Sequence, residues 1–242
     1  MKGRKWSSLA LELLVVVVGI FLGLQADSWY QSRSEQRELE TYLQALSEEL
    51  GTSAWMRGNY VQWHRRVIDG LKLATDSLDG AQLTPDETEQ AFFGLTHLSN
   101  PPTSPQRYAV LAAMQAAGML RLIDDTKLRQ MLGELLTGID TERSEYDRFM
   151  GSIDAPAFSA KLVRYGLAQN DEVEIIAVDW EAARQDAAFR QRILQGIGAY
   201  GYLLGYHEAY ETISRDALAL LSEAGIEPSG NWLEENQEKF SN

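Results

Sequence analysis

The stretch Leu13–Leu24 reads LLVVVVGIFLGL, twelve consecutive residues without a polar side chain. Aromatic residues flank it, with Trp6 on one side and the Trp29–Tyr30 pair on the other. A helix from Trp6 to Trp29 rises about 35 Å at ~1.5 Å per residue, enough to cross a hydrocarbon core of about 30 Å. We therefore predict a single transmembrane helix over residues 6–28.

Three basic residues precede this segment: Lys2, Arg4 and Lys5. Short flanks rich in lysine and arginine are retained in the cytoplasm, so we expect residues 1–5 to be cytoplasmic and residues 29–242 to be extracytoplasmic. The competing interpretation is a cleaved signal peptide. Its cleavage site at Leu24-Gln25-Ala26 is poor, because a large leucine stands where a small residue is preferred.

One line along the predicted anchor gathers small residues and a carboxyl group. At about 100° per residue its members all fall within about 40° of one line along the helix: Ser8, Glu12, Val16, Gly19, Gly23 and Ala26. Glycine allows a second helix to approach closely, and a carboxyl inside a bilayer needs a partner or a proton. We interpret this line as an intramembrane contact face for another membrane-protein subunit or a second copy. The alternative is that Glu12 reaches the interface and the glycines are incidental.

Beyond the anchor, apolar residues recur at helical spacing. Leu39, Leu43, Leu46 and Leu50 are four, three and four residues apart, and the pattern resumes from residue 56 to residue 78. Gly51-Thr52-Ser53 interrupts it, so this long helix is either continuous or bent near Gly51.

Capping residues divide the rest of the chain into further helices. Thr84 followed by proline starts a short helix, and Asp124 or Asp125 caps a later one. Asp179 caps a helix that we expect to run to Ala224, with Gly225 at the position after its end.

Shorter segments connect these helices. Tyr108–Ala117 is predicted to be helical, with Gly118 ending it, and a short helix is expected around Phe158–Tyr165. Val173–Val178 is a candidate for brief extended structure, and Ser99–Pro105 reads as a polyproline-like connector. The sequence therefore predicts an all-α protein, a transmembrane helix followed by an elongated helical bundle.

Composition excludes several functions. The net charge is −13, so the chain repels phosphate backbones, and nucleic-acid binding is not expected. There is no cysteine, which removes thiolate nucleophiles, zinc fingers and iron–sulfur ligation together.

The remaining motifs are better explained by packing between helices than by a catalytic, cofactor or metal site. Gly196–Gly201 matches GxGxxG, but the residues before it read as helix instead of the strand that a dinucleotide site needs. The histidines lack the spacing of known metal motifs, so we predict no catalytic, cofactor or metal site. A stripe at helical spacing is either bundle core or the lining of a pocket: Tyr202, Tyr206 and Tyr210.

Three segments resemble an uncharacterised family of bacterial single-pass membrane proteins. The anchor matches through Glu12–Ile20, Leu24-Gln25 and Trp29, and a second match covers Tyr108–Ile123 and Leu128-Arg129. Phe189–Tyr206 fits more loosely. The resemblance implies an inner-membrane anchor and a helical periplasmic domain, and the family has no established function.

We therefore expect a non-catalytic, membrane-anchored interaction protein, an accessory or scaffolding subunit of a membrane assembly. The alternative is an extracytoplasmic small-molecule sensor that signals through a partner protein.

Overall fold

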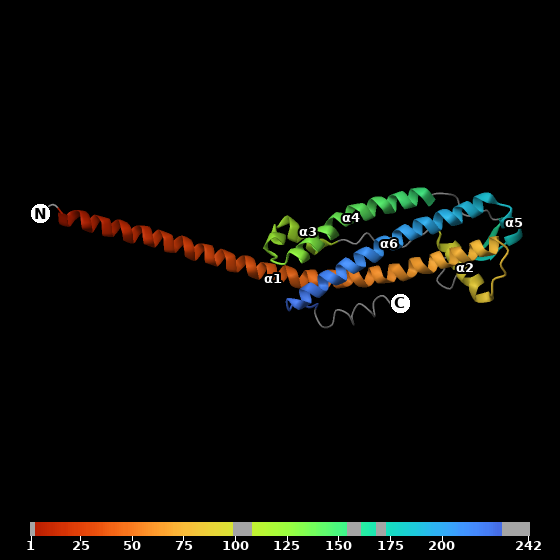
Figure 1. Cartoon of the computed structure of the whole chain (residues 1–242), viewed down its shortest axis with the longest axis horizontal. Helices are drawn as coiled ribbons and strands as arrows, with labels where there is room; N and C mark the ends of the chain where they lie inside the picture. The colour runs from red at the N-terminus through yellow and green to blue at the C-terminus, as the bar shows by residue number, and fades with distance from the viewer. Residues whose placement is uncertain (1–2, 99–107, 154–160, 168–172, 229–242) are drawn as a thin grey trace.

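One helix, α1, forms the spine of the molecule and runs over Gly3–Leu78, a length of 76 residues. In this computed structural model the described residues are 3–98, 108–153, 161–167 and 173–228. The first half of α1 projects away from the rest of the chain, while its second half lies along the other helices (Figure 1). The long helix predicted from the leucine spacing is therefore confirmed.

No break occurs where α1 passes Gly51, and the continuous alternative is the one observed. The hydroxyl of Thr52 donates to the carbonyl oxygen of Glu48 at 2.8 Å. The hydroxyl of Ser53 lies 2.6 Å from that of Tyr108. Both polar side chains thus find partners within helical geometry, which removes their preference for a turn.

The apolar segment of α1 is exposed on every side. The large side chains described between Leu14 and Leu24 are 47% to 65% exposed. In the residues that the structure describes, no helix is long and apolar enough to cross a membrane. The side chains of residues 3–13 and of Val15, which make up much of the predicted span, lie outside the described part. The anchor stays a prediction.

Helix α2 (Pro85–His97) begins as predicted and packs closely against α1. The hydroxyl of Thr84 accepts the backbone N–H of Glu87, and the Glu87 carboxylate accepts the backbone N–H of Thr84 in return. Where the helices cross, a Cβ added at Gly94 would lie 2.7 Å from backbone atoms of Gly70 and Leu71. Only glycine permits this approach.

The next elements are α3 (Ala109–Ala116), the 3-10 helix η1 (Met119–Leu122) and α4 (Thr126–Ile153). Gly118 separates α3 from η1 with a φ of +70°, as predicted for a residue that ends a helix. Of the two aspartates proposed to cap α4, Asp125 makes the bond, accepting the backbone N–H of Leu128 at 2.9 Å. The predicted connector over residues 99–105 lies outside the described residues.

An antiparallel hairpin corrects the all-α prediction. Strands β1 (Val163–Leu167) and β2 (Val173–Val178) pair with each other, so the extended structure predicted for Val173–Val178 is confirmed. The helix expected up to Tyr165 is wrong for its described residues. Val163 and Ile175 bury their side chains against the helices, and strand alternation is the arrangement that allows this. The fold is therefore mostly helical with one added hairpin.

Two helices replace the single one predicted after Asp179. That residue caps α5 (Trp180–Arg184), and Asp186 then caps α6 (Ala187–Glu223) by accepting the backbone N–H groups of Ala188 and Phe189. A second aspartate seven residues after the first offers a new cap, and the chain restarts there. Gly225 ends α6 with a φ of +80°, as predicted.

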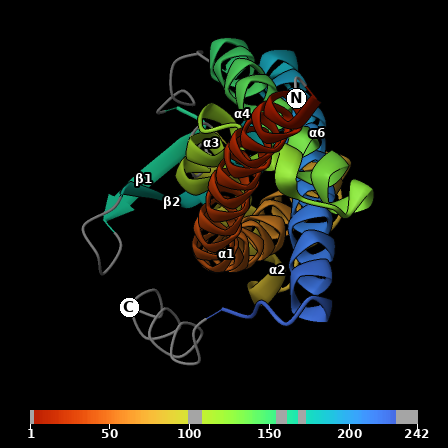
Figure 2. The same ribbon diagram turned by 90° about the vertical axis from the view of Figure 1, so that its left-hand side faces the viewer.

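The core divides into two apolar clusters along the length of α1 and α6. The proximal cluster, nearer the projecting part of α1, includes Leu46, Leu50, Leu111, Leu132, Leu135 and Leu221. The distal cluster includes Leu71, Leu95, Leu98, Phe189, Ile193 and Leu203. Viewed along α1, the hairpin projects from one side of the bundle and α6 lies on the other (Figure 2).

Candidate functional site

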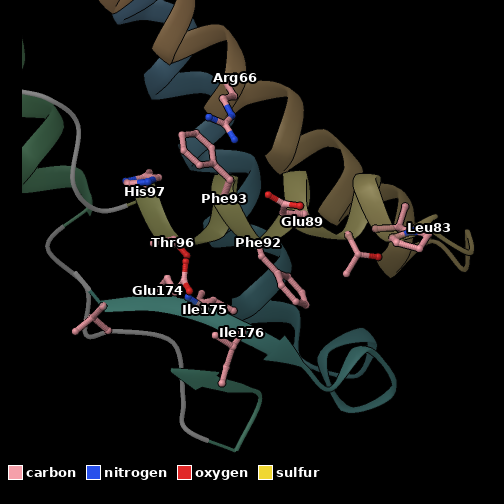
Figure 3. Close-up of a pocket in the computed structure, with 13 residues that line it drawn as sticks. Arg66, Leu83, Glu89, Phe92, Phe93, Thr96, His97, Glu174, Ile175 and Ile176 are labelled. Carbon is pink, nitrogen blue, oxygen red and sulfur yellow. The ribbon is translucent and has the colours of Figure 1, made fainter. Parts of the chain in front are cut away.

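A groove with a volume of about 820 Å³ opens between α2 and β2, beside the distal cluster. Phe92 enters it from α2 and Arg66 reaches its rim from α1, whereas Ile176 borders it from β2 with its side chain pointing away from α2 (Figure 3). Ile176 is 49% exposed and Val173, at the open end, is 59% exposed. Apolar side chains left in water next to a concave surface are typical of a binding site.

Aromatic contacts fix one wall of this groove. The Phe93 ring lies 4.4 Å from the His97 ring and 6.2 Å from the Trp63 ring, between centroids. The Arg66 guanidinium carbon sits 3.9 Å from the centroid of Phe93, and the Gln90 amide donates to the Arg66 carbonyl at 2.6 Å. The rim therefore carries a cation with a fixed orientation.

The other wall is an incompletely paired strand edge. The backbone N–H of Ile175 donates to the hydroxyl of Thr96 at 2.8 Å, so a side chain of α2 occupies one position where a neighbouring strand would bond. Within the described residues, only β1 pairs with β2. An extended peptide could bond the rest of this edge and place apolar side chains against Phe92 and Leu83.

A second concentration of functional groups lies inside the bundle, between the two apolar clusters. We call it the polar layer; its members are buried and come from α1, α4 and α6: Ser53, Arg57, His64, Glu142, His207 and Ser214. Arg57 forms a forked ion pair with Glu142, with nitrogen–oxygen distances of 2.8 and 3.5 Å. Arg57 also lies 3.3 Å from the Nδ1 atom of His207.

Both imidazoles of the polar layer are held neutral. Arginine can only donate, so Nδ1 of His207 accepts from Arg57 and the ring carries no charge. Burial, followed by the nearby His64 and Arg57, lowers the pKa of His207 to about 3. Burial also lowers the pKa of His64, whose Nδ1 donates to the carbonyl of Tyr60. The ring centroids of the two histidines lie 5.1 Å apart.

The tyrosine stripe of α6 is divided between core and surface. Tyr206 donates to the carbonyl of Gly138 at 2.7 Å and stacks on Tyr210, with 4.6 Å between ring centroids. The guanidinium carbon of Arg57 lies 5.1 Å from the Tyr210 ring centroid. Tyr202, one turn before Tyr206 on the same face of α6, is 53% exposed.

The predicted intramembrane face has no neighbour within the described chain. A Cβ added at Gly19 or Gly23 would meet no atom within 4 Å, and Val16 and Ala26 are exposed. The side chains of Ser8 and Glu12 lie outside the described part.

Within α6, the GxGxxG residues are helical. Gly196 is buried and would clash with the Leu98 side chain if it carried a Cβ, whereas Gly198 and Gly201 are exposed. Of these three glycines, Gly196 is therefore the one at which α6 packs closely against a neighbouring side chain, that of Leu98.

Sequence reasoning missed the polar layer. A signal was present on α1, where Ser53, Arg57 and His64 occupy positions that continue the buried leucine pattern. Polar residues at core positions indicate buried partners elsewhere in the chain. Their partners on α4 and α6 have no local signature.

Within the described residues, no three histidine, aspartate or glutamate side chains converge to hold a metal ion. No protein-family model, curated protein or solved structure matches this chain.

Proposed function

We propose that this chain is a non-catalytic, membrane-anchored interaction protein, an accessory or scaffolding subunit of a bacterial inner-membrane assembly. Residues 6–28 cross the bilayer once, residues 1–5 stay in the cytoplasm and residues 29–242 lie in the periplasm. The resemblance of the anchor to an uncharacterised family of bacterial single-pass membrane proteins agrees with this topology.

The observation that carries the proposal is the exposed apolar segment of α1. Leu14, Val17 and Phe21 lie on one side of the helix, while Ile20 and Leu22 lie on others, and all are at least 55% exposed. A helix that is apolar all round needs apolar surroundings on every side, which a bilayer supplies and a single partner helix does not. The same helix continues without interruption into the bundle, so anchor and bundle form one rigid element.

The groove between α2 and β2 supplies the docking site in this proposal. It lies in the part of the bundle far from the apolar segment, where a periplasmic partner could reach it (Figure 1). We assign it an extended, mainly apolar segment of a partner subunit, bonded to the free edge of β2. A scaffold needs no catalytic group, and the sequence predicts none.

Extraction and labelling test the anchor. The full chain should stay in the membrane fraction after alkaline carbonate washing. The parent has no cysteine, so Gly3→Cys and Thr41→Cys each report one site. An impermeant maleimide applied to intact spheroplasts should label Thr41→Cys alone. Release by carbonate would refute the anchor, and labelling of Gly3→Cys alone would reverse the orientation.

A photo-crosslinking amino acid tests the groove. Placed at Phe92, it should join the chain to one discrete partner in intact cells, and Leu83→Lys should abolish the product by placing a charge on the apolar wall. The matched control places the same amino acid at Gln130, on the exposed side of α4. Equal products from both positions, or persistence of the product with Leu83→Lys, would remove the groove from the proposal.

The second candidate function is small-molecule sensing, which the volume of the groove favours. About 820 Å³ lies within the range of ligand sites, roughly 300–1,000 Å³. A compound that raises the melting temperature of the full chain, and fails to do so with Leu83→Lys, would support sensing over docking.

A further inference from the structure

Just after the apolar segment, α1 carries a surface that we call the basic ledge, formed by Trp29, Arg33 and Arg37. Trp29, Arg33 and Arg37 follow one another at spacings of four residues, so their side chains share a face. With Ser32, Gln36 and Glu40 they line a shallow recess of about 550 Å³. The guanidinium carbon of Arg33 lies 5.2 Å from the centroid of the Trp29 ring.

The charge of this ledge is not neutralised within the described chain. No carboxylate of the described residues lies within ion-pair distance of Arg33 or Arg37, whereas Arg57, Arg65 and Arg215 each hold a carboxylate. Glu35 and Glu38 fall on the opposite side of the helix at about 100° per residue. Glu40 closes the end of the recess farther from the apolar segment.

The position along α1 matches the headgroup layer of a bilayer. With residues 6–28 as the span, Trp29 lies at the interface, where tryptophan is enriched. The headgroup layer is about 5–7 Å thick on each side, and Arg33 lies roughly 6 Å beyond Trp29 at ~1.5 Å per residue. Because its guanidinium reaches back over Trp29, the charge of Arg33 points toward the membrane.

We infer that Arg33 and Arg37 bind the phosphate of an anionic phospholipid in the leaflet that faces the bundle, and that Trp29 packs against the same lipid. A guanidinium presents two parallel N–H groups that match phosphate oxygens. Arg37, whose backbone lies roughly 12 Å beyond Trp29 at ~1.5 Å per residue, supplies a second set by extending its side chain back toward the membrane. The indole packs against the upper acyl chain and glycerol while its edge stays at the interface. This inference rests on the proposed membrane anchor.

Native mass spectrometry of the full chain released from nanodiscs tests the inference. The nanodiscs contain equal amounts of phosphatidylglycerol and phosphatidylcholine. The parent should retain phosphatidylglycerol over phosphatidylcholine by roughly twentyfold, and Arg33→Gln or Arg37→Gln should each lower that ratio roughly fivefold. Arg143→Gln, an exposed arginine on α4, is the matched control and should leave the ratio unchanged.

The remaining outcomes separate this inference from the anchor itself. A chain that fails to elute with nanodiscs would overturn the anchor and the lipid site together. A chain that elutes with them and retains both lipids equally would overturn the lipid site alone. Excess inorganic phosphate should not displace the retained lipid; if it does, the ledge binds free phosphate and the lipid assignment is wrong.

Discussion

At the scale of single residues, the polar layer places an ion pair where the bundle would otherwise be apolar. Removing two charges from water is unfavourable, and the attraction between Arg57 and Glu142 offsets this only while both are present. The forked geometry also ties α1 to α4. We infer that the pair selects one arrangement of these helices more than it raises the free energy of unfolding.

Removing one member of this pair should be more harmful than removing both. Glu142→Gln leaves the buried Arg57 uncompensated and should lower the free energy of unfolding by about 3 kcal/mol or more. The double variant Arg57→Met/Glu142→Leu should recover most of that loss. Urea denaturation of the full chain in mild detergent measures both. A double variant as unstable as the single one would show that the pair itself provides the stability.

Stability should fall as the pH drops from about 6.5 toward 5. The pKa of His207 is about 3 in the folded chain against an ordinary value of 6.5, so between these values the unfolded chain binds the proton first. Stability is then fully present above pH 6.5 and declines by up to about 1.4 kcal/mol per pH unit below it. The lowered pKa of His64 acts in the same direction.

Denaturation series at several pH values between 7.5 and 5 measure this slope. The variant His207→Gln has no proton to gain at this position and should show a shallower slope than the parent. Equal slopes for parent and variant would show that His207 does not control the pH dependence.

At the scale of elements, the crossing of α1 and α2 depends on a glycine pair. Gly94→Ala would push a methyl group against the backbone of Gly70, which cannot move aside, and should destabilise the chain by about 2–3 kcal/mol. Gly198→Ala is the matched control, a helical glycine with open space around it, and should stabilise slightly, by up to ~1 kcal/mol. Thermal unfolding of both variants measures the difference, and equal shifts would contradict the close crossing.

Local signals explain which elements could be predicted from the sequence. Thr84, Asp125 and Gly225 act on backbone groups within a few residues, so the sequence contains all the information that places them. The strand Val163–Leu167 is different, because its conformation depends on pairing with β2 and burial against the helices. Short segments of this kind carry weak propensity, and tertiary contacts decide their structure.

The candidate site was harder to predict for the same reason. The groove lies between α2, which ends at His97, and β2, which begins at Val173, so its two walls are far apart in the sequence. Arg57 and Glu142 are likewise 85 positions apart. Periodicity shows that a position is buried, but not which distant residue faces it.

At the scale of the whole molecule, α1 sets the height of the groove above the proposed membrane. From Trp29 to Arg66 the helix rises about 55 Å at ~1.5 Å per residue. A continuous helix braced along its second half by α6 holds that distance constant, whereas a hinge at Gly51 would let the bundle tilt. A scaffold that presents a docking groove at one height needs the rigid form.

A distance measurement across Gly51 tests this rigidity. The exposed residues Ser28 and Gln62 can be changed to cysteine in a chain that has no other, and then spin-labelled in nanodiscs. Pulsed electron resonance should give one narrow distribution near 50 Å, because 34 residues of helix rise about 51 Å. Gly51→Pro serves as the comparison, since proline removes a helical hydrogen bond and should broaden and shorten the distribution. If the parent already resembles Gly51→Pro, the spine is hinged, and the groove cannot be held at a fixed height by α1 alone.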